Sequence, residues 1–219
     1  MEKQKQALIA GFLAASLAAV FFGWVANEML RGQTMHFDMA VRGQIHSWAT
    51  PLLTRSMRGV TLLGSAELLV LFGVVLIWRL MAQKRIRAAV VLLIAVIGGE
   101  ALDQVLKIMF RRPRPEPFFG LPAPENFSFP SGHAVASCCF YLVVAAIVTA
   151  RMKSPARRLA AWTGAAVLAG AIGFSRVYLG VHYPSDVLAG YATAVIWIAA
   201  VRTGYLIWIR RDRLRNQDS

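Results

Sequence analysis

Two histidines and one carboxylate in this chain are spaced so that they could form a catalytic set. His182 precedes Asp186 by four residues in the segment SRVYLGVHYPSD, so the carboxylate can hold one imidazole nitrogen. That hydrogen bond would fix the tautomer and leave the other nitrogen free as a nucleophile. His133, which follows Pro-Ser-Gly in the segment SFPSGHAVAS, could protonate a leaving oxygen.

Three cations and a helix start accompany these residues. Lys107 and Arg114 lie in the basic run KIMFRRPRP, and Arg176 lies in the segment that also holds His182. A guanidinium matches phosphate oxygens with two hydrogen bonds, and lysine adds a point charge. Ser131 and Gly132 would begin a helix whose free N–H groups attract anions. A phosphate is therefore the simplest ligand for this set of groups.

Each motif alone has a second interpretation. The His182–Asp186 pair could be a structural hydrogen bond or a zinc ligand pair, although three nearby cations would repel Zn²⁺. The Pro-Ser-Gly-His turn could simply begin a helix, and the cations could anchor lipid headgroups. Their joint occurrence favours phosphoryl transfer, in which positioning and charge stabilisation do most of the work. We therefore expect no metal and no other cofactor.

Apolar helices would position these residues. The chain of 219 residues is 57% hydrophobic and 16% charged, which is more apolar than a typical soluble domain. A helix needs about 20 apolar residues to cross a bilayer. The pattern predicts one domain, 1–219, of the all-α class: an integral membrane bundle of six transmembrane helices. The predicted spans lie near 6–27, 61–79, 87–108, 133–150, 158–175 and 186–209.

An amphipathic interfacial segment is predicted between the first two spans, over residues 35–58. Its apolar residues recur at helical spacing: Phe37, Val41, Ile45, Trp48 and Leu52. Charged residues lie between them, and Pro51 breaks the run. The wider segment 28–59 could be a structural cover or could help lipids reach the site, and the sequence leaves both interpretations open.

The charge pattern predicts an orientation in the membrane. The net charge of +13 lies between apolar runs, which indicates headgroup anchoring and argues against nucleic acid as a partner. Segments on the side of both termini carry 14 Lys and Arg residues, against 9 on the other side. The positive-inside rule then places both termini in the cytoplasm and the three motifs on the outer side.

The three motifs resemble the signature of the type 2 phosphatidic acid phosphatase family, the membrane relatives of vanadium haloperoxidases and glucose-6-phosphatase. That signature is Lys, six residues, Arg-Pro; then Pro-Ser-Gly-His; then Ser-Arg, five residues, His, three residues, Asp. It is complete here as Lys107…Arg114-Pro115, Pro130–His133 and Ser175-Arg176…His182…Asp186. The resemblance covers 107–186, and the six predicted spans extend it to nearly the whole chain.

The resemblance implies a role for each position. His182 would become a transient phosphohistidine polarised by Asp186, and His133 would protonate the leaving group. The phosphoryl oxygens would be held by Lys107, Arg114, Ser131, the Gly132 amide and Arg176. Pro130 and Ser175 would support the motifs in which they stand.

Four charged residues near the first motif fall outside the signature. Arg111 and Arg112 would contact headgroups or mark the interface. Glu100 and Asp103 share one helix face with Lys107, and our hypothesis is that these acids pair with Lys107 or Arg176. The alternative is hydrogen bonding between helices.

Together these features predict a metal-independent lipid phosphatase of the bacterial cytoplasmic membrane, with its site facing the extracytoplasmic side. Its substrate would be the phosphate monoester or diphosphate of a membrane lipid. Among bacterial relatives the usual substrates are undecaprenyl diphosphate and phosphatidylglycerophosphate, and phosphatidic acid and diacylglycerol diphosphate are also accepted. An outward site favours undecaprenyl diphosphate, because that lipid is released there.

Other functions remain open at the level of sequence. Lipid A dephosphorylation and phosphoryl transfer to a second lipid are the nearest enzymatic alternatives. A non-catalytic phosphate-binding or phospholipid-binding membrane protein is the alternative outside the enzymes, although binding alone needs no nucleophile. A transporter would need broken helices deep in the membrane, and a soluble haloperoxidase would lack the six spans. The oligomeric state is left undetermined.

Overall fold

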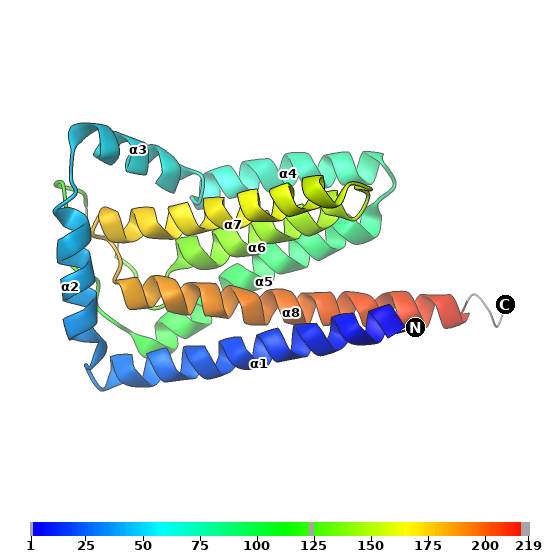
Figure 1. Cartoon of the computed structure of the whole chain (residues 1–219), viewed down its shortest axis with the longest axis horizontal. Helices are drawn as coiled ribbons and strands as arrows, with labels where there is room; N and C mark the ends of the chain where they lie inside the picture. The colour runs from blue at the N-terminus through cyan, green and yellow to red at the C-terminus, as the bar shows by residue number, and fades with distance from the viewer. Residues whose placement is uncertain (1, 123–124, 216–219) are drawn as a thin grey trace.

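The computed structural model describes residues 2–122 and 125–215 as a bundle of helices, with no strand among them. Eight helices make up this described part: α1 (Glu2–Leu30), α2 (Thr34–His46), α3 (Pro51–Leu62), α4 (Ala66–Ala82), α5 (Ile86–Phe110), α6 (Gly132–Thr149), α7 (Pro155–Tyr178) and α8 (Pro184–Arg215). The long helices run side by side, and α2 lies across one end of them (Figure 1).

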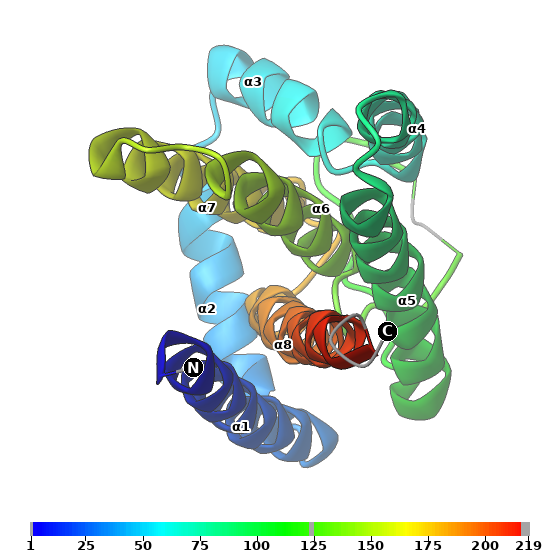
Figure 2. The same ribbon diagram turned by 90° about the vertical axis from the view of Figure 1, so that its right-hand side faces the viewer.

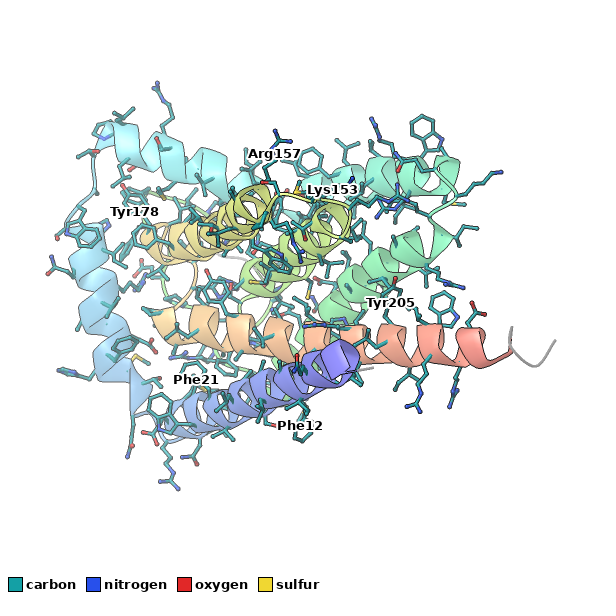
Figure 3. The ribbon with its side chains drawn as sticks, turned by 45° about the vertical axis from the view of Figure 1, so that its right-hand side comes forward. Phe12, Phe21, Lys153, Arg157, Tyr178 and Tyr205 are labelled. Carbon is teal, nitrogen blue, oxygen red and sulfur yellow. The ribbon has the colours of Figure 1, made fainter. Side chains whose placement is uncertain are left out.

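Five of these helices are long and apolar enough to cross a membrane: α1, α5, α6, α7 and α8. The pair α3 and α4 passes the same test only jointly and is bent by 47°, so the described chain has five candidate spans, or six if the bent pair is one. Large apolar side chains cover the outer surface of the bundle. Phe12 on α1, for example, is 72% exposed, and Phe21 projects from the same helix (Figure 3). This is a multi-pass membrane protein.

Helix α6 lies at the centre of the bundle. It packs against α4, α5, α7 and α8, and α1 runs along α8 on the outside (Figure 2). The start of α1 and the end of α8 lie at the end of the bundle away from α2 (Figure 1). Lys153 and Arg157 lie near the start of α7, whereas Tyr178 lies at its other end, beside α2 (Figure 3). The termini whose location was predicted, residues 1 and 216–219, lie outside the described residues.

The predicted second span, 61–79, is wrong at its start. Helix α4 begins at Ala66, after a break at residues 63–65, and the Ser65 side chain accepts a hydrogen bond from the Leu68 amide at 3.4 Å. A Cβ atom added to Gly64 would lie 2.4 Å from Cγ2 of Ile172 on α7. The chain therefore passes α7 too closely for any side chain, and the helix bends at this contact.

The segment 35–58 forms two helices, α2 and α3, and the predicted break before Pro51 is confirmed. Thr50 caps α3 by accepting a hydrogen bond from the Leu53 amide at 3.2 Å. The buried face of α2 includes only Ile45 of the predicted apolar stripe. The face consists of Thr34, Asp38, Arg42 and Ile45. Phe37, a member of the predicted stripe, is 48% exposed.

The close contact at Gly64 generates a stability prediction. In Gly64→Ala the new methyl group must displace Ile172, so we expect a loss of about 1–3 kcal/mol in the free energy of unfolding. Gly59→Ala on α3 is the matched control, because its Cβ would meet nothing within 4 Å. Thermal unfolding of both variants in one detergent measures the difference. Equal midpoints would contradict the steric account of the bend.

Candidate active site

A cavity of about 380 Å³ lies at the end of the bundle near α2, where residues of all three sequence motifs meet. Its polar wall consists of Glu100, Asp103, Gln104, Lys107, Arg114, Asn126, Gly132, His133, Arg176 and His182. Its apolar wall comes from α4, α5 and α6 and includes Leu69, Val70, Val96 and Ala136. A second cavity of about 490 Å³, beside α3, contains Arg55 and Arg58 but no histidine or carboxylate.

His182 stands in the turn between α7 and α8, and Asp186 lies in the first turn of α8. The Nδ1 atom of His182 is 3.3 Å from Oδ2 of Asp186, which also accepts a hydrogen bond from the Tyr183 amide at 2.9 Å. The Nε2 atom lies 2.9 Å from NH1 of Arg114. A guanidinium can only donate, so Nε2 accepts and the ring proton is on Nδ1. The imidazole therefore presents its Nε2 lone pair toward Arg114.

The surroundings of His182 keep its ring neutral. Burial lowers the pKa of His182 well below its ordinary value, and the positive charges of Arg114, Arg176 and Lys107 lower it further. A neutral imidazole with a fixed tautomer is the form that can act as a nucleophile.

Lys107 lies buried near the end of α5, where it donates to the Asp103 carboxylate and to the carbonyl of Pro130 at 2.8 Å. A Cβ atom on Gly132 would lie 2.9 Å from Oδ2 of Asp103, so only glycine fits beside this ion pair. The predicted pairing of Asp103 with Lys107 is confirmed.

The prediction for Glu100 is wrong. Its carboxylate is exposed to the cavity and accepts a hydrogen bond from Gln104 at 2.7 Å, within the same helix. Gln104 is four residues further along the same helix, so its side chain lies next to that of Glu100. Neither Lys107 nor Arg176 is the partner of Glu100.

Several polar atoms at the cavity have no partner. Among the described residues, five buried side-chain polar atoms lack a hydrogen bond, and three of these belong to predicted site residues: Oγ of Ser131, Nε of Arg176 and Oδ1 of Asp103. Arg176 is otherwise held by Thr61, which accepts from its NH1 at 2.8 Å. Buried polar groups are nearly always paired. Arg176 lines the cavity and Ser131 lies just behind its wall, so the Arg176 Nε–H and the Ser131 hydroxyl are donors that the protein itself leaves unused.

The other predicted residues lie at or just behind the cavity. His133 lines it from the first turn of α6, and Arg114 reaches it from the loop after α5, where the Asn126 carbonyl accepts from its Nε at 2.8 Å. Pro130 lies behind the wall and supplies the carbonyl that binds Lys107. Ser175 does not line the cavity, because its hydroxyl is buried and donates to the Ile172 carbonyl at 2.6 Å.

The interpretation of Arg112 as a headgroup contact is wrong. Its side chain is only 6% exposed and donates to Asp186 and Asp38, both at 2.7 Å. Neighbouring Arg111 is exposed, and its Nε donates to the Ile108 carbonyl. The sequence offered no signal for the contact of Arg112 with Asp38, because 74 residues separate them and no motif links them.

Comparisons with known proteins agree with the arrangement of these motifs. The family model described as the PAP2 superfamily matches residues 87–210. Phosphatidylglycerophosphatase B of Bacillus subtilis (strain 168) is 31% identical over 164 residues, which are 74% of this chain and 80% of that protein. Undecaprenyl-diphosphatase of Sulfolobus acidocaldarius is 34% identical over 118 residues, which are 51% of this chain and 53% of that protein.

Two crystal structures have a similar fold. One is a transmembrane PAP2 type phosphatidylglycerolphosphate phosphatase from Bacillus subtilis, with a TM-score of 0.80 and 27% identity. The match covers 86% of this chain and 94% of that one. The other is LpxE of Aquifex aeolicus, with a TM-score of 0.56 and 25% identity, covering 76% of this chain and 95% of that one.

The lowered pKa of His182 generates a prediction for the pH profile of any reaction in which this ring is the nucleophile. Protonation of Nε2 would stop attack, so the acid limb of kcat/KM should lie below the ordinary histidine pKa of about 6.5. Rates should be measured from about pH 4.5 to about pH 8 with a monoester and a diphosphate in parallel, because a limb set by the substrate will differ between them. A shared acid limb at or above about pH 6.5 would contradict the neutral ring.

Proposed function

The chain belongs to the PAP2 superfamily, and we propose that it is a lipid phosphatase that works through a phosphohistidine at His182. One observation carries the proposal: the neutral Nε2 of His182 lies at a cavity whose unpartnered donors suit phosphate oxygens. The apolar wall, which includes Leu69, Val70 and Val96, suits the hydrocarbon chain of a lipid. A protein that only binds phosphate would have no use for the fixed tautomer of His182.

In the first step Nε2 of His182 attacks phosphorus as the bond to the leaving oxygen breaks. His133, in its protonated imidazolium form, gives a proton to that oxygen and becomes neutral, and the positive charge gained by the ring of His182 is offset by Asp186. In the second step water attacks the phosphorus and the P–N bond breaks. His133 takes the water's proton, inorganic phosphate leaves, and His182 is neutral again with its proton still on Nδ1.

The cations would hold the phosphoryl group through both steps. Arg114 now donates to Nε2 of His182, so substrate binding must move this contact to a phosphoryl oxygen and expose the lone pair. Arg176, Lys107 and Ser131 have donors facing the same space or close behind it. Charge stabilisation of this kind is the main source of catalysis in phosphoryl transfer. No step calls for a metal ion.

Phosphatidylglycerophosphate and undecaprenyl diphosphate are the two proposed substrates. The matched Bacillus proteins support the first, because the similarity extends over most of both chains. The matched Sulfolobus protein and an outward-facing site support the second. Lipid A dephosphorylation and phosphoryl transfer to a second lipid are the remaining alternatives.

We place the protein in the bacterial cytoplasmic membrane as one domain with six spans, in which α3 and α4 form one bent span. Both termini would be cytoplasmic, since the start of α1 and the end of α8 lie at one end of the bundle and the connecting segments there are the more basic. The cavity, at the other end, would face outward, with α2 at the interface.

Phosphate release by the purified protein in detergent tests the proposed function. The substrates are undecaprenyl diphosphate, phosphatidylglycerophosphate, phosphatidic acid and lipid A, each with and without excess EDTA. We expect EDTA-resistant release that falls at least about a thousandfold in His182→Ala, because the nucleophile is lost. Folded wild-type protein that releases no phosphate from any of these lipids would refute the proposed function, and release abolished by EDTA would refute the metal-free mechanism.

The role of His133 as the general acid predicts a dependence on the leaving group. His133→Asn should slow single-turnover formation of phosphohistidine from a lipid monoester by about 10²–10⁴-fold, because the departing alkoxide then lacks a proton donor. This first step is measured by itself, because His133 also acts as the base in the second step. With p-nitrophenyl phosphate the loss should be much smaller, since nitrophenolate leaves without a proton. An equal loss on both substrates would instead indicate that His133 only binds or positions phosphate.

A further inference from the structure

We propose that Asp38 and Arg112 are positioning residues for the reaction: they hold Asp186, and through it His182, in the charge state and orientation needed for attack on phosphorus. This inference rests on the proposed function, since it takes His182 as the nucleophile. Neither residue lines the cavity, and neither belongs to the three sequence motifs.

Arg112 connects helix α2 to the turn between α7 and α8 that carries His182. Its NH1 donates to Oδ1 of Asp186 and to the hydroxyl of Ser185, both at 2.7 Å. Its NH2 donates to Oδ2 of Asp38 at 2.7 Å and to the hydroxyl of Thr34 at 3.2 Å. Both oxygens of Asp186 are thus hydrogen-bonded, because Oδ2 accepts from Nδ1 of His182 and from the amide of Tyr183.

Asp38 also binds the nucleophile's turn directly. Its Oδ1 accepts from the Ser185 amide at 2.9 Å, and its Oδ2 accepts from the Ser185 hydroxyl at 2.7 Å. Its side chain is fully buried, as is that of Asp186. A buried carboxylate is costly unless it is paired and hydrogen-bonded, and here every contact is to the turn or to Arg112.

The charges of this group suit the reaction. Asp186 and Arg112 alone would sum to zero, so His182 would face a neutral pair. Asp38 adds a second negative charge, and the three side chains together carry one net negative charge next to the ring. That charge stabilises the positive charge that the imidazole gains when Nε2 bonds to phosphorus. Asp38 thus acts on His182 through Arg112 and Asp186, without touching the substrate.

Helix α2 holds the same turn at a second point. Arg42, one helical turn after Asp38, donates to the carbonyl of Gly180 at 3.2 Å and to the carbonyl of Glu116. The guanidinium of Arg42 also lies 4.2 Å from the ring centre of Phe118. Helix α2 crosses the end of the bundle where these loops meet (Figure 1). The role of this segment, which the sequence left open, would be to position His182.

The test uses Asp38→Asn and Arg112→Lys in the full-length protein in detergent. Asp38→Asn keeps the shape of the side chain and removes its charge; Arg112→Lys keeps the charge and removes the planar fork. We expect single-turnover formation of phosphohistidine to slow by about 10–100-fold in each, the size of loss found when the hydrogen-bond partner of a metal-binding histidine is removed. KM should stay nearly unchanged, because neither side chain lines the cavity.

A purely structural role would produce a different result. It would lower the thermal midpoint or the yield while the folded fraction formed phosphohistidine at the wild-type rate. Asp212→Asn is the matched control, because Asp212 pairs with Arg87 on an exposed surface and should leave the rate unchanged. Two variants are used so that one remains informative if the other does not fold.

Each outcome is decisive. Wild-type rates of phosphohistidine formation in folded Asp38→Asn or Arg112→Lys would overturn the inference while leaving the proposed function intact. Wild-type protein that forms no phosphohistidine and releases no phosphate from any lipid would refute the proposed function itself. A slowed rate with nearly unchanged KM in the variants, and a normal rate in Asp212→Asn, would support the positioning role.

Discussion

The hydrogen bond between Nδ1 of His182 and Oδ2 of Asp186 connects the fold to the site. His182 stands in a turn, whereas Asp186 is part of α8, a helix that packs against α1, α5 and α6. The ring is therefore oriented by a helix that contacts most of the other helices of the bundle. The Ser131 amide at the start of α6 donates to the Asp186 carbonyl at 3.0 Å. The Pro-Ser-Gly-His motif is therefore bonded to the same residue that holds His182.

Charge balance decides which cations remain for a ligand. Within the described chain, Lys107 is neutralised by Asp103, and Arg112 is paired with both Asp38 and Asp186. Arg114 and Arg176 also face the cavity, but no carboxylate in that part of the chain forms an ion pair with either. Two partly buried guanidinium groups at a membrane surface are costly without an anion. The charge of a phosphate is of the sign and size that would offset them.

The sequence predicted the features that depend on local pattern. Hydropathy identified the long helices, and the motif spacing identified the residues that now meet at one cavity, including His133 and His182. The resemblance to the type 2 phosphatidic acid phosphatase family is confirmed by the family match and by the relatives. A local pattern cannot encode contact between distant residues. Arg112 was interpreted as a headgroup contact or an interface marker because nothing in its neighbourhood points to Asp38, 74 residues away. The start predicted for the second span was too early for the same reason, since the helix break lies where Gly64 approaches Ile172 of the distant helix α7.

The face that helix α2 buries against the protein is mostly polar. In water the apolar stripe of such a helix turns toward the protein. Here the polar residues Asp38 and Arg42 are buried against the loops of the site, and Met35, Phe37 and Met39 are exposed. At the proposed interface lipid can cover those apolar side chains, so the helix need not bury them against protein. The polar face is then free to bind the turn that carries His182, and the same amphipathic pattern serves the membrane on one side and the site on the other.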